Sequence, residues 1–284
     1  MKKIIILGLI LFLTFLGKNV FGATNIDSRY SDLAKKLKQQ KYSDTEIKKI
    51  LTDKRIKHYP DILKSVKKND VYFCPDSEYF TEESIAKGKN FLAEYGPLLE
   101  EAEVKYKVEK EIITGVFRME SNFGNYLGKH KVMNTYLTMI YYDFKTTYVD
   151  KKTGRIKVKE WKPESEKQII SFLRICRKNN IDDPYEVDGS RRGAFGLVQF
   201  IPTSYEAFAV DGNGDGIIDL FNIYDAVPSA ANYLKQNGWE YGVSINAPFT
   251  TKHVIWIYNN WMGYVKAVVI YALMIKNSTI KIDF

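Results

Sequence analysis

The stretch "GVFRMESNFG", residues 115–124, places one acidic residue at the end of an apolar helical pattern. Apolar side chains recur at helical spacing from Ile112 to Phe117, and Glu120 follows on the same stripe. The stretch closes with Gly124, and a glycine just past a periodic run is the usual left-handed end of a helix. The sequence therefore predicts a helix whose last turn points a carboxyl group toward the core.

That position determines the chemistry expected of Glu120. Apolar surroundings remove water from the carboxylate and the negative end of the helix dipole repels it, so both effects raise its pKa. A carboxyl group that stays protonated near neutral pH can serve as a general acid, as in lysozyme. The alternative is a structural side chain that turns to solvent or pairs with Arg118 or Lys129.

The first 23 residues have the three parts of a signal peptide. Two lysines come first, an apolar run fills residues 4–16, and small residues stand at positions 22 and 23. We therefore expect an exported protein of the periplasm or cell envelope, with an uncleaved membrane anchor as the alternative. The 284 residues are enough for one large domain or two modest ones.

The charge balance is basic. The whole chain carries a net charge of +8, and removing the three lysines of residues 1–23 leaves +5. For an exported chain, which we expect to be a monomer, this argues against nucleic acid and favours an anionic polymer such as the cell wall, or peripheral association with a lipid surface. Cys74 and Cys176 are the two cysteines, and export permits a disulfide without requiring one.

The chain is mainly α with a little strand. A lysine-rich helical lead-in fills residues 24–70 and contains a capping-box pair, Ser43 and Glu46. Helical patterns follow at 81–108, broken near Gly96-Pro97, and at 163–178, 203–208, 226–236 and 254–276. Residues 147–161 have β-branched and aromatic residues on both sides of a turn, which predicts a β-hairpin.

A second informative stretch is "GSRRGAFGLVQFIPTSYEAFA", residues 189–209. Its small residues allow close approach of the backbone to a ligand or another segment, and Gln199 presents an amide group directly after them. Thr203 and Glu206 are spaced as a capping pair for the next helix. Tight loop packing is the alternative explanation of the small residues.

A third stretch, "DGNGDGIIDLFNIYD", residues 211–225, resembles the opening of an EF-hand calcium loop. Carboxylate and amide groups alternate, a glycine follows for the sharp turn, and a backbone carbonyl comes next. The twelfth position is Asn222 where a glutamate is expected, and a longer loop would end on a carboxylate at Asp225. The alternative is a surface turn. The candidate ligands are Asp211, Asn213, Asp215, the Ile217 carbonyl and Asp225.

A fourth stretch, residues 256–273, combines tyrosines with amides beside an apolar helix. Tyr258, Asn259 and Tyr264 provide the aromatic faces and neighbouring polar groups on which sugar rings pack, although a tyrosine-rich core helix would look the same. The three histidines lack metal-ligand spacing, and no Ser/His/Asp arrangement is apparent. Zinc and serine-type chemistry therefore have no support in the sequence.

Taken in order, the four stretches resemble the membrane-bound lytic transglycosylase B family over residues 72–273. The resemblance implies a lysozyme-like fold of the goose-type kind, with a catalytic domain at residues 71–284 that acts on peptidoglycan strands. It implies that Glu120 in "MESNFG" is catalytic, that Asp225 is the last ligand of a structural calcium ion, and that no organic cofactor is needed. The substrate-binding residues that it implies are Ser190, Gln199, Tyr233, Tyr258, Asn259 and Tyr264.

The sequence departs from the family pattern in several places. Phe195 stands where a methionine is usual and Trp261 where a serine is usual. The hairpin at 147–161 looks like an insertion, and the segment from Trp239 to Tyr258 is too short for the β-rich subdomain often found there. We expect these changes to affect the binding of the glycan strand more than the catalytic chemistry.

The implied reaction cleaves the β-1,4 bond between N-acetylmuramic acid and N-acetylglucosamine without water and leaves 1,6-anhydro ends. Glu120 would act first as acid and then as base, so one carboxyl group suffices, whereas hydrolytic glycosidases use two. Two alternatives stay open: a hydrolytic muramidase whose second acid is not visible, and a wall-binding protein without activity.

Overall fold

The computed structural model describes residues 25–64, 71–74, 77–150, 153–248 and 252–277, and the predicted leader lies outside these ranges. The described residues are mainly helical. The helices are η1 (Ser28–Tyr30), α1 (Ser31–Gln39), α2 (Asp44–Leu51), η2 (Pro60–Leu63), α3 (Glu82–Glu94), α4 (Gly96–Tyr106), α5 (Lys110–Ser121), α6 (Val132–Tyr141), α7 (Lys162–Lys178), α8 (Pro202–Phe208), α9 (Ile223–Gln236), α10 (His253–Tyr258) and α11 (Met262–Lys276). The strands are β1 (His130–Lys131), β2 (Lys145–Val149), β3 (Ile156–Glu160) and β4 (Asp188–Gly189).

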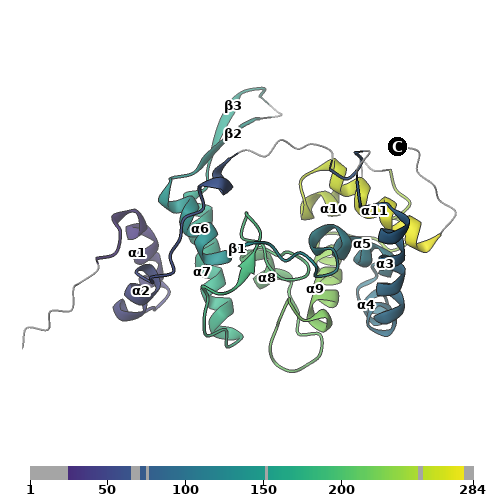
Figure 1. Cartoon of the computed structure of the whole chain (residues 1–284), viewed down its shortest axis with the longest axis horizontal. Coiled ribbons are helices and arrows are strands. Elements are labelled where there is room, and N and C mark those ends of the chain that lie inside the picture. Colours follow the sequence, from purple (N-terminus) through teal and green to yellow (C-terminus); the bar gives the residue numbers. More distant parts are fainter. Residues whose placement is uncertain (1–24, 65–70, 75–76, 151–152, 249–251, 278–284) are drawn as a thin grey trace, which may run out of the picture.

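The molecule is elongated. The lead-in helices α1 and α2 lie at one end, and α3, α4, α5, α10 and α11 gather at the other (Figure 1). Two ion pairs join α1 to α7, from Lys36 to Glu166 at 2.6 Å and from Lys162 to Asp32 at 2.9 Å. The predicted capping box at the start of α2 is confirmed, because Ser43 and Glu46 each bond to the backbone of the other.

Helix α5 is buried at almost every position, which explains its apolar sequence. All residues from Glu111 to Met119 are buried, and the neighbouring α11 approaches closely at Gly115. A Cβ atom at Gly115 would lie 2.8 Å from the carbonyl oxygen of Val268, so only glycine fits there. Glu120 is thus held at the end of a helix that neighbours fix on several sides.

The predicted hairpin is also present. β2 and β3 pair antiparallel, with Lys145 opposite Glu160 and Val149 opposite Ile156. The hairpin projects from the body beyond α6 and α7 (Figure 1). The other sheet is a short antiparallel pair in which His130 lies opposite Gly189, and it brings the loop after α5 to the loop that contains Ser190.

Two sequence predictions are wrong in detail. The pattern at 254–276 is two helices rather than one, because the chain is extended from Asn259 to Trp261 and the Trp261 ring stacks on Tyr72 at 5.0 Å. Thr203 and Glu206 do not cap α8. The Thr203 hydroxyl accepts a hydrogen bond from Gln168, and Glu206 pairs with Arg174 at 2.7 Å. In both places tertiary contacts outweigh the local pattern.

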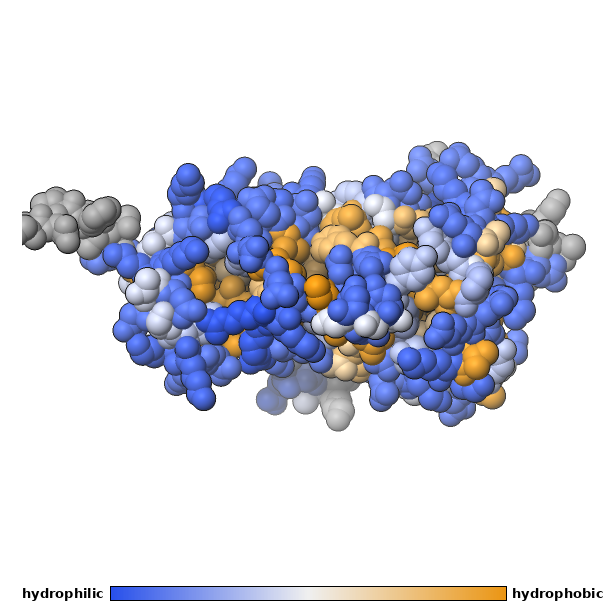
Figure 2. All heavy atoms as spheres, turned by 90° about the horizontal axis from the view of Figure 1, so that it is seen from below, coloured by the Kyte–Doolittle hydropathy of each residue, from blue (hydrophilic) through white to orange (hydrophobic). Residues whose placement is uncertain are grey.

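The face of the molecule in Figure 2 is mainly polar, and the two cysteines lie in different environments. The face seen from below is mostly hydrophilic, with apolar patches along its middle (Figure 2). No helix in the described residues combines the length and apolarity that a membrane span requires. Cys74 is exposed, Cys176 is buried, and both are free thiols, so the structure holds no bridge between them.

Candidate active site

Glu120 lies in the last turn of α5, as predicted. The helix ends on three consecutive left-handed residues, Asn122 (φ 49°), Phe123 (φ 57°) and Gly124 (φ 87°), so the turn begins two residues before the expected glycine. Glu120 itself is partly exposed. The sharp turn stops the chain from continuing over the carboxyl group and leaves it accessible.

The environment of Glu120 favours its neutral form. Burial among packed side chains raises its pKa to about 7, and an interaction with Tyr264 acts in the opposite direction. Within the described residues Glu120 forms no ion pair, because Arg118 instead donates to the Ser84 hydroxyl at 2.8 Å and to the Glu78 carbonyl at 2.9 Å. No second carboxyl group in this part of the chain shifts the pKa of Glu120. The structural alternative of a pair with Arg118 or Lys129 is therefore wrong.

Tyr264, on α11, is fully buried next to Glu120. Its hydroxyl has no hydrogen-bond partner of ordinary geometry in the described structure, yet it lies close enough to the carboxyl group to lower the pKa of Glu120. Burial and then the charge of Glu120 raise the pKa of Tyr264 well above its usual value. The phenol therefore stays protonated and can donate to the carboxylate when Glu120 loses its proton.

Tyr233 on α9 and Tyr258 at the end of α10 also face Glu120. Their ring centroids are 4.5 Å apart, and the Tyr258 ring is stacked near Tyr264 at 6.3 Å. Burial and then the Glu120 charge raise the pKa of Tyr233 to about 12 and that of Tyr258 well above its usual value. We call Glu120, Tyr233, Tyr258 and Tyr264 the Glu120 cluster. The structure thus brings together four of the residues predicted for the site.

Gln199 joins this cluster through the backbone. Tyr258 donates to the carbonyl oxygen of Val198 at 2.6 Å, which fixes the residue directly before Gln199. Gln199 has a left-handed backbone (φ 48°) that a glutamine rarely adopts, and its amide donates to the Gly196 carbonyl at 2.9 Å. Such strain is tolerated only where the surroundings hold the loop firmly.

Ser190 and Asn259, the other two residues predicted to bind substrate, have mainly local contacts. The Ser190 hydroxyl accepts hydrogen bonds from the backbone amides of Ala194 at 3.1 Å and Arg192 at 3.3 Å, so it shapes its own loop. Asn259 ends α10, and its carbonyl accepts from the Trp261 amide at 2.6 Å. The described contacts do not join either side chain to Glu120.

Tyr79 is a residue that the sequence reasoning missed. Burial raises its pKa, Arg118 lowers it, and the charge of Glu120 raises it further, which places Tyr79 beside the Glu120 cluster. The Arg118 guanidinium lies over its ring at 4.5 Å, and Tyr72 packs against it at 4.7 Å. No local pattern signals this role, because Tyr79 stands well before α5 and meets Glu120 only through the fold.

The predicted calcium loop has part of the expected conformation. Asp211 accepts the amides of Gly214 at 2.7 Å and Gly216 at 2.8 Å, and Asp215 accepts that of Ile217 at 2.8 Å. Gly216 has the positive φ (86°) that the sharp turn requires. The Asp211, Asn213, Asp215 and Ile217 positions therefore fit the opening half of such a loop.

Asp225 closes the loop from inside. It is 1% exposed, and its two oxygens accept the amides of Gly212 at 2.8 Å and Asp219 at 2.7 Å. Each oxygen keeps a second lone pair that a cation could use. In the residues that the structure covers, however, no group of three or more His, Cys, Asp or Glu side chains is arranged to hold a metal. Asp225 by itself already ties the loop together.

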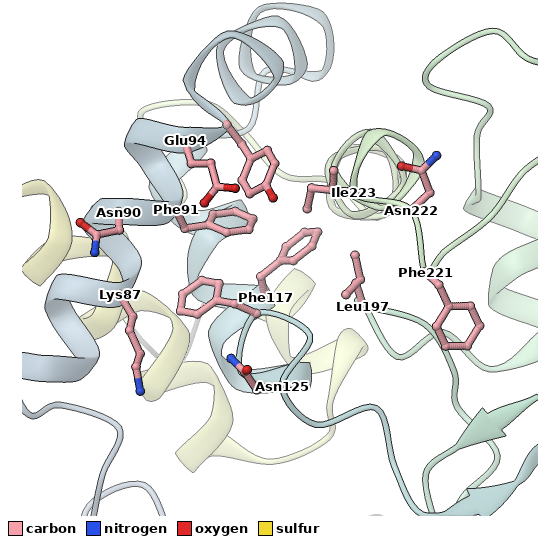
Figure 3. Close-up of a pocket in the computed structure, with 12 residues that line it drawn as sticks. Lys87, Asn90, Phe91, Glu94, Phe117, Asn125, Leu197, Phe221, Asn222 and Ile223 are labelled. Carbon is pink, nitrogen blue, oxygen red and sulfur yellow. The ribbon is translucent and has the colours of Figure 1, made fainter.

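A cavity of about 480 Å³ lies beside the same elements but away from the Glu120 cluster. Aromatic rings such as Phe91 and Phe117 point into it, and polar groups including Lys87, Glu94 and Asn125 surround them (Figure 3). None of the predicted site residues lines it. The Glu120 cluster, on α5, α9, α10 and α11, therefore does not line this cavity.

Comparison with known proteins places this chain in a family. The model of the transglycosylase SLT domain matches residues 25–255. The membrane-bound lytic murein transglycosylase B of Escherichia coli is 32% identical over 166 residues, which are 58% of this chain and 41% of that protein. The chain thus matches less than half of the length of this curated relative.

Solved structures share the fold. The E. coli lytic transglycosylase Slt35 in complex with calcium has a TM-score of 0.73 at 22% identity, covering 89% of this chain and 94% of that one. Pseudomonas aeruginosa SltB3 in complex with NAG-anhNAM-pentapeptide has a TM-score of 0.68 at 19% identity, covering 88% and 80%. The chain belongs to the transglycosylase SLT domain family and has the lysozyme-like fold of the lytic transglycosylases.

Proposed function

We propose that this protein is a peptidoglycan lytic transglycosylase. It cleaves the β-1,4 bond between N-acetylmuramic acid and N-acetylglucosamine and leaves a 1,6-anhydro-muramic acid end. The observation that carries the proposal is a single carboxyl group, Glu120, with a pKa raised to about 7 by burial and with no second carboxyl group among the described residues acting on it. Family membership and the names of the relatives support the same substrate class.

Glu120 supplies both proton transfers. At neutral pH about half of the molecules carry the neutral acid that protonates the bridging oxygen, since the pKa is about 7. The resulting carboxylate then takes the proton of the muramic 6-hydroxyl while that oxygen attacks C1. Tyr264 lies where its hydroxyl can stabilise this carboxylate between the two steps.

The remaining residues bind and orient the sugar. Tyr233 and Tyr258 present aromatic faces beside Glu120, and Gln199 presents its amide from a fixed loop. Ser190 and Asn259 are proposed substrate residues on the resemblance alone, because their described contacts are local. The aromatic faces suit sugar rings.

We also propose a structural calcium ion in the loop 211–225. The alternating Asp211, Asn213 and Asp215, the Ile217 carbonyl and Asp225 would hold it, and the relative solved with calcium supports this choice of ion. Calcium would stabilise the loop, which packs beside the Gln199 segment through a hydrogen bond from Leu197 to Leu220 at 2.8 Å. No organic cofactor is proposed.

The location and domain division remain proposals. We propose an exported protein of the periplasm or cell envelope, with residues 1–23 as the leader, 24–70 as a helical lead-in and 71–284 as the catalytic domain. The ion pairs between α1 and α7 support a lead-in that is packed on the rest of the chain.

The test uses one activity and two matched variants. Wild-type protein, Glu120→Gln and Glu111→Gln are incubated with purified peptidoglycan, and the amount of soluble muropeptide released by each is measured. Glu111 is on the same helix at its other end, so it controls for loss of a buried charge on α5. We expect release to fall at least about 100-fold in Glu120→Gln and to persist in Glu111→Gln. Equal release by all three proteins would rule out Glu120 as the acid.

A further inference from the structure

The β2–β3 hairpin has an aliphatic face that the molecule itself does not cover. Residues opposite each other in an antiparallel pair point to the same side, so Val149 and Ile156 share a face with Thr147 and Val158. Val149 is 61% exposed, Ile156 75% and Val158 59%. Three branched aliphatic side chains thus lie side by side in water on a two-stranded sheet, an arrangement that usually marks an interaction surface.

The hairpin is also strongly basic. Residues 145–160 contain six lysines and arginines and two acidic residues. On the face opposite to the aliphatic one, Lys157 and Lys159 extend from β3, and Lys159 lies over the ring of Trp161 at 4.0 Å. The hairpin projects from the body (Figure 1), so this charge can approach a flat surface without obstruction by the helices.

The aliphatic face and the positive charge of the hairpin together indicate which kind of partner it binds. Sugar polymers pack on aromatic rings rather than on valine and isoleucine, so the aliphatic face does not suit the glycan itself. A bilayer with anionic headgroups takes aliphatic side chains at the level of its acyl chains and attracts lysine and arginine to its surface. We propose that the β2–β3 hairpin docks the protein on an anionic lipid surface by its turn end, where Val149 and Ile156 pair. In this orientation the aliphatic face with Val158 enters the interface while the lysines of the other face reach the headgroups.

The exposed strand edges fit this use. Both strands of the hairpin are edges, and an exposed edge with an apolar face would pair with a second copy unless something prevented it. Lys145 pairs with Glu160 and Lys157 with Asp150, but the six basic residues of the hairpin still outnumber its two acidic ones, and this net positive charge opposes pairing with a second copy. The same net charge is attracted to anionic headgroups, so the composition disfavours a second copy and favours lipid. This inference does not depend on the proposed reaction.

A fluorescent probe on the hairpin tests the docking directly. In the full chain with Cys74→Ser, an Ile156→Cys variant is labelled with a polarity-sensitive dye, and the control carries the dye at Val104→Cys on α4, where the residue is 68% exposed. We expect a blue shift of the Ile156 dye on vesicles of phosphatidylcholine with phosphatidylglycerol, none on phosphatidylcholine alone, and none at Val104. Because the probe reports its own position, attachment through the N-terminal residues does not imitate the result.

A second arm measures affinity. The variant Val149→Ser/Ile156→Ser/Val158→Ser should bind the anionic vesicles at least about tenfold more weakly than wild type, while Val104→Ser/Val243→Ser should bind equally well. Unchanged melting temperatures show that the variants are folded. Equal binding of the triple variant, or no blue shift on anionic vesicles, would overturn the proposal. A blue shift that instead follows protein concentration or added peptidoglycan would identify a second copy or the wall as the partner and overturn it equally.

Discussion

The hydroxyl of Tyr264 lies buried beside the carboxyl group of Glu120 and lowers the pKa of that group. A buried phenol needs a strong acceptor, and Glu120 becomes one when it loses its proton. The neutral carboxyl group needs no donor, whereas the carboxylate does. The pair therefore allows one glutamate to be acid and base in turn.

The first prediction concerns pH. The acid step needs protonated Glu120, so the rate should fall as the pH rises through about 7, the pKa set by burial. Tyr264→Phe removes the group that lowers this pKa, so the fall should move to higher pH while the maximal rate decreases. Rates of muropeptide release measured across pH for both proteins check this. An unmoved profile would show that Tyr264 does not act on Glu120.

The second prediction concerns stability. The pKa of Glu120 rises from 4.5 to about 7 on folding, so the native state keeps a proton that the unfolded chain releases. Its contribution to stability is complete below pH 4.5 and is lost as the pH rises through 7, a difference of up to about 3 kcal/mol. Glu120→Gln should lack this loss and be more stable than wild type at pH 8 but not at pH 4.5. Denaturant unfolding at the two pH values measures it, and equal differences at both would contradict it.

Much of the fold follows from sequence patterns. The break between α3 and α4 at Gly96-Pro97, the hairpin and the end of α5 near Glu120 all depend on local rules of turns and caps, and all are confirmed. The break between α10 and α11 was not predicted, because it depends on Trp261 stacking on Tyr72, far away in the sequence. Local periodicity carries no information about such a contact.

Some residues of the candidate site are likewise indicated by the sequence, whereas others depend on packing between distant segments. Glu120 stands out because a carboxyl group on an apolar stripe is unusual, and Tyr258 and Tyr264 stand out as tyrosines beside amides in residues 256–273. Tyr233 came from the family resemblance. Tyr79 was missed, since its place beside Glu120 results from packing between distant segments. The strain at Gln199 could not be foreseen either, because its φ of 48° is imposed by the loop around it.

The third prediction uses that strain. Gln199→Gly relieves the left-handed backbone, whereas Gln199→Ala keeps it, and both remove the amide. If the amide orients the sugar, both variants should lose activity at least about tenfold, and the glycine variant should be the more stable by about 1 kcal/mol. Activity and melting temperature are measured together. A glycine variant with full activity would exclude a role for the amide.

The fourth prediction separates calcium from the loop itself. Added calcium should raise the melting temperature of the wild type by mass action, and Asp215→Ala should abolish this rise while changing the melting temperature little in chelator. Asp225→Ala should destabilise the protein even in chelator, because the buried amides of Gly212 and Asp219 lose their acceptor. If added calcium leaves the melting temperature of the wild type unchanged, the loop is a surface turn and not a calcium site.

The central claim is that the nucleophile is the muramic 6-hydroxyl and not water. That hydroxyl is already held beside C1, so its effective concentration far exceeds that of a free reactant when the site orients the sugar. The most direct measurement is mass spectrometry of the muropeptides released from purified peptidoglycan. The account predicts products about 18 Da, one water, lighter than those of a hydrolytic muramidase, and without a reducing end, as intramolecular attack requires. Dominant products whose muramic end borohydride reduces would contradict it and identify water as the nucleophile.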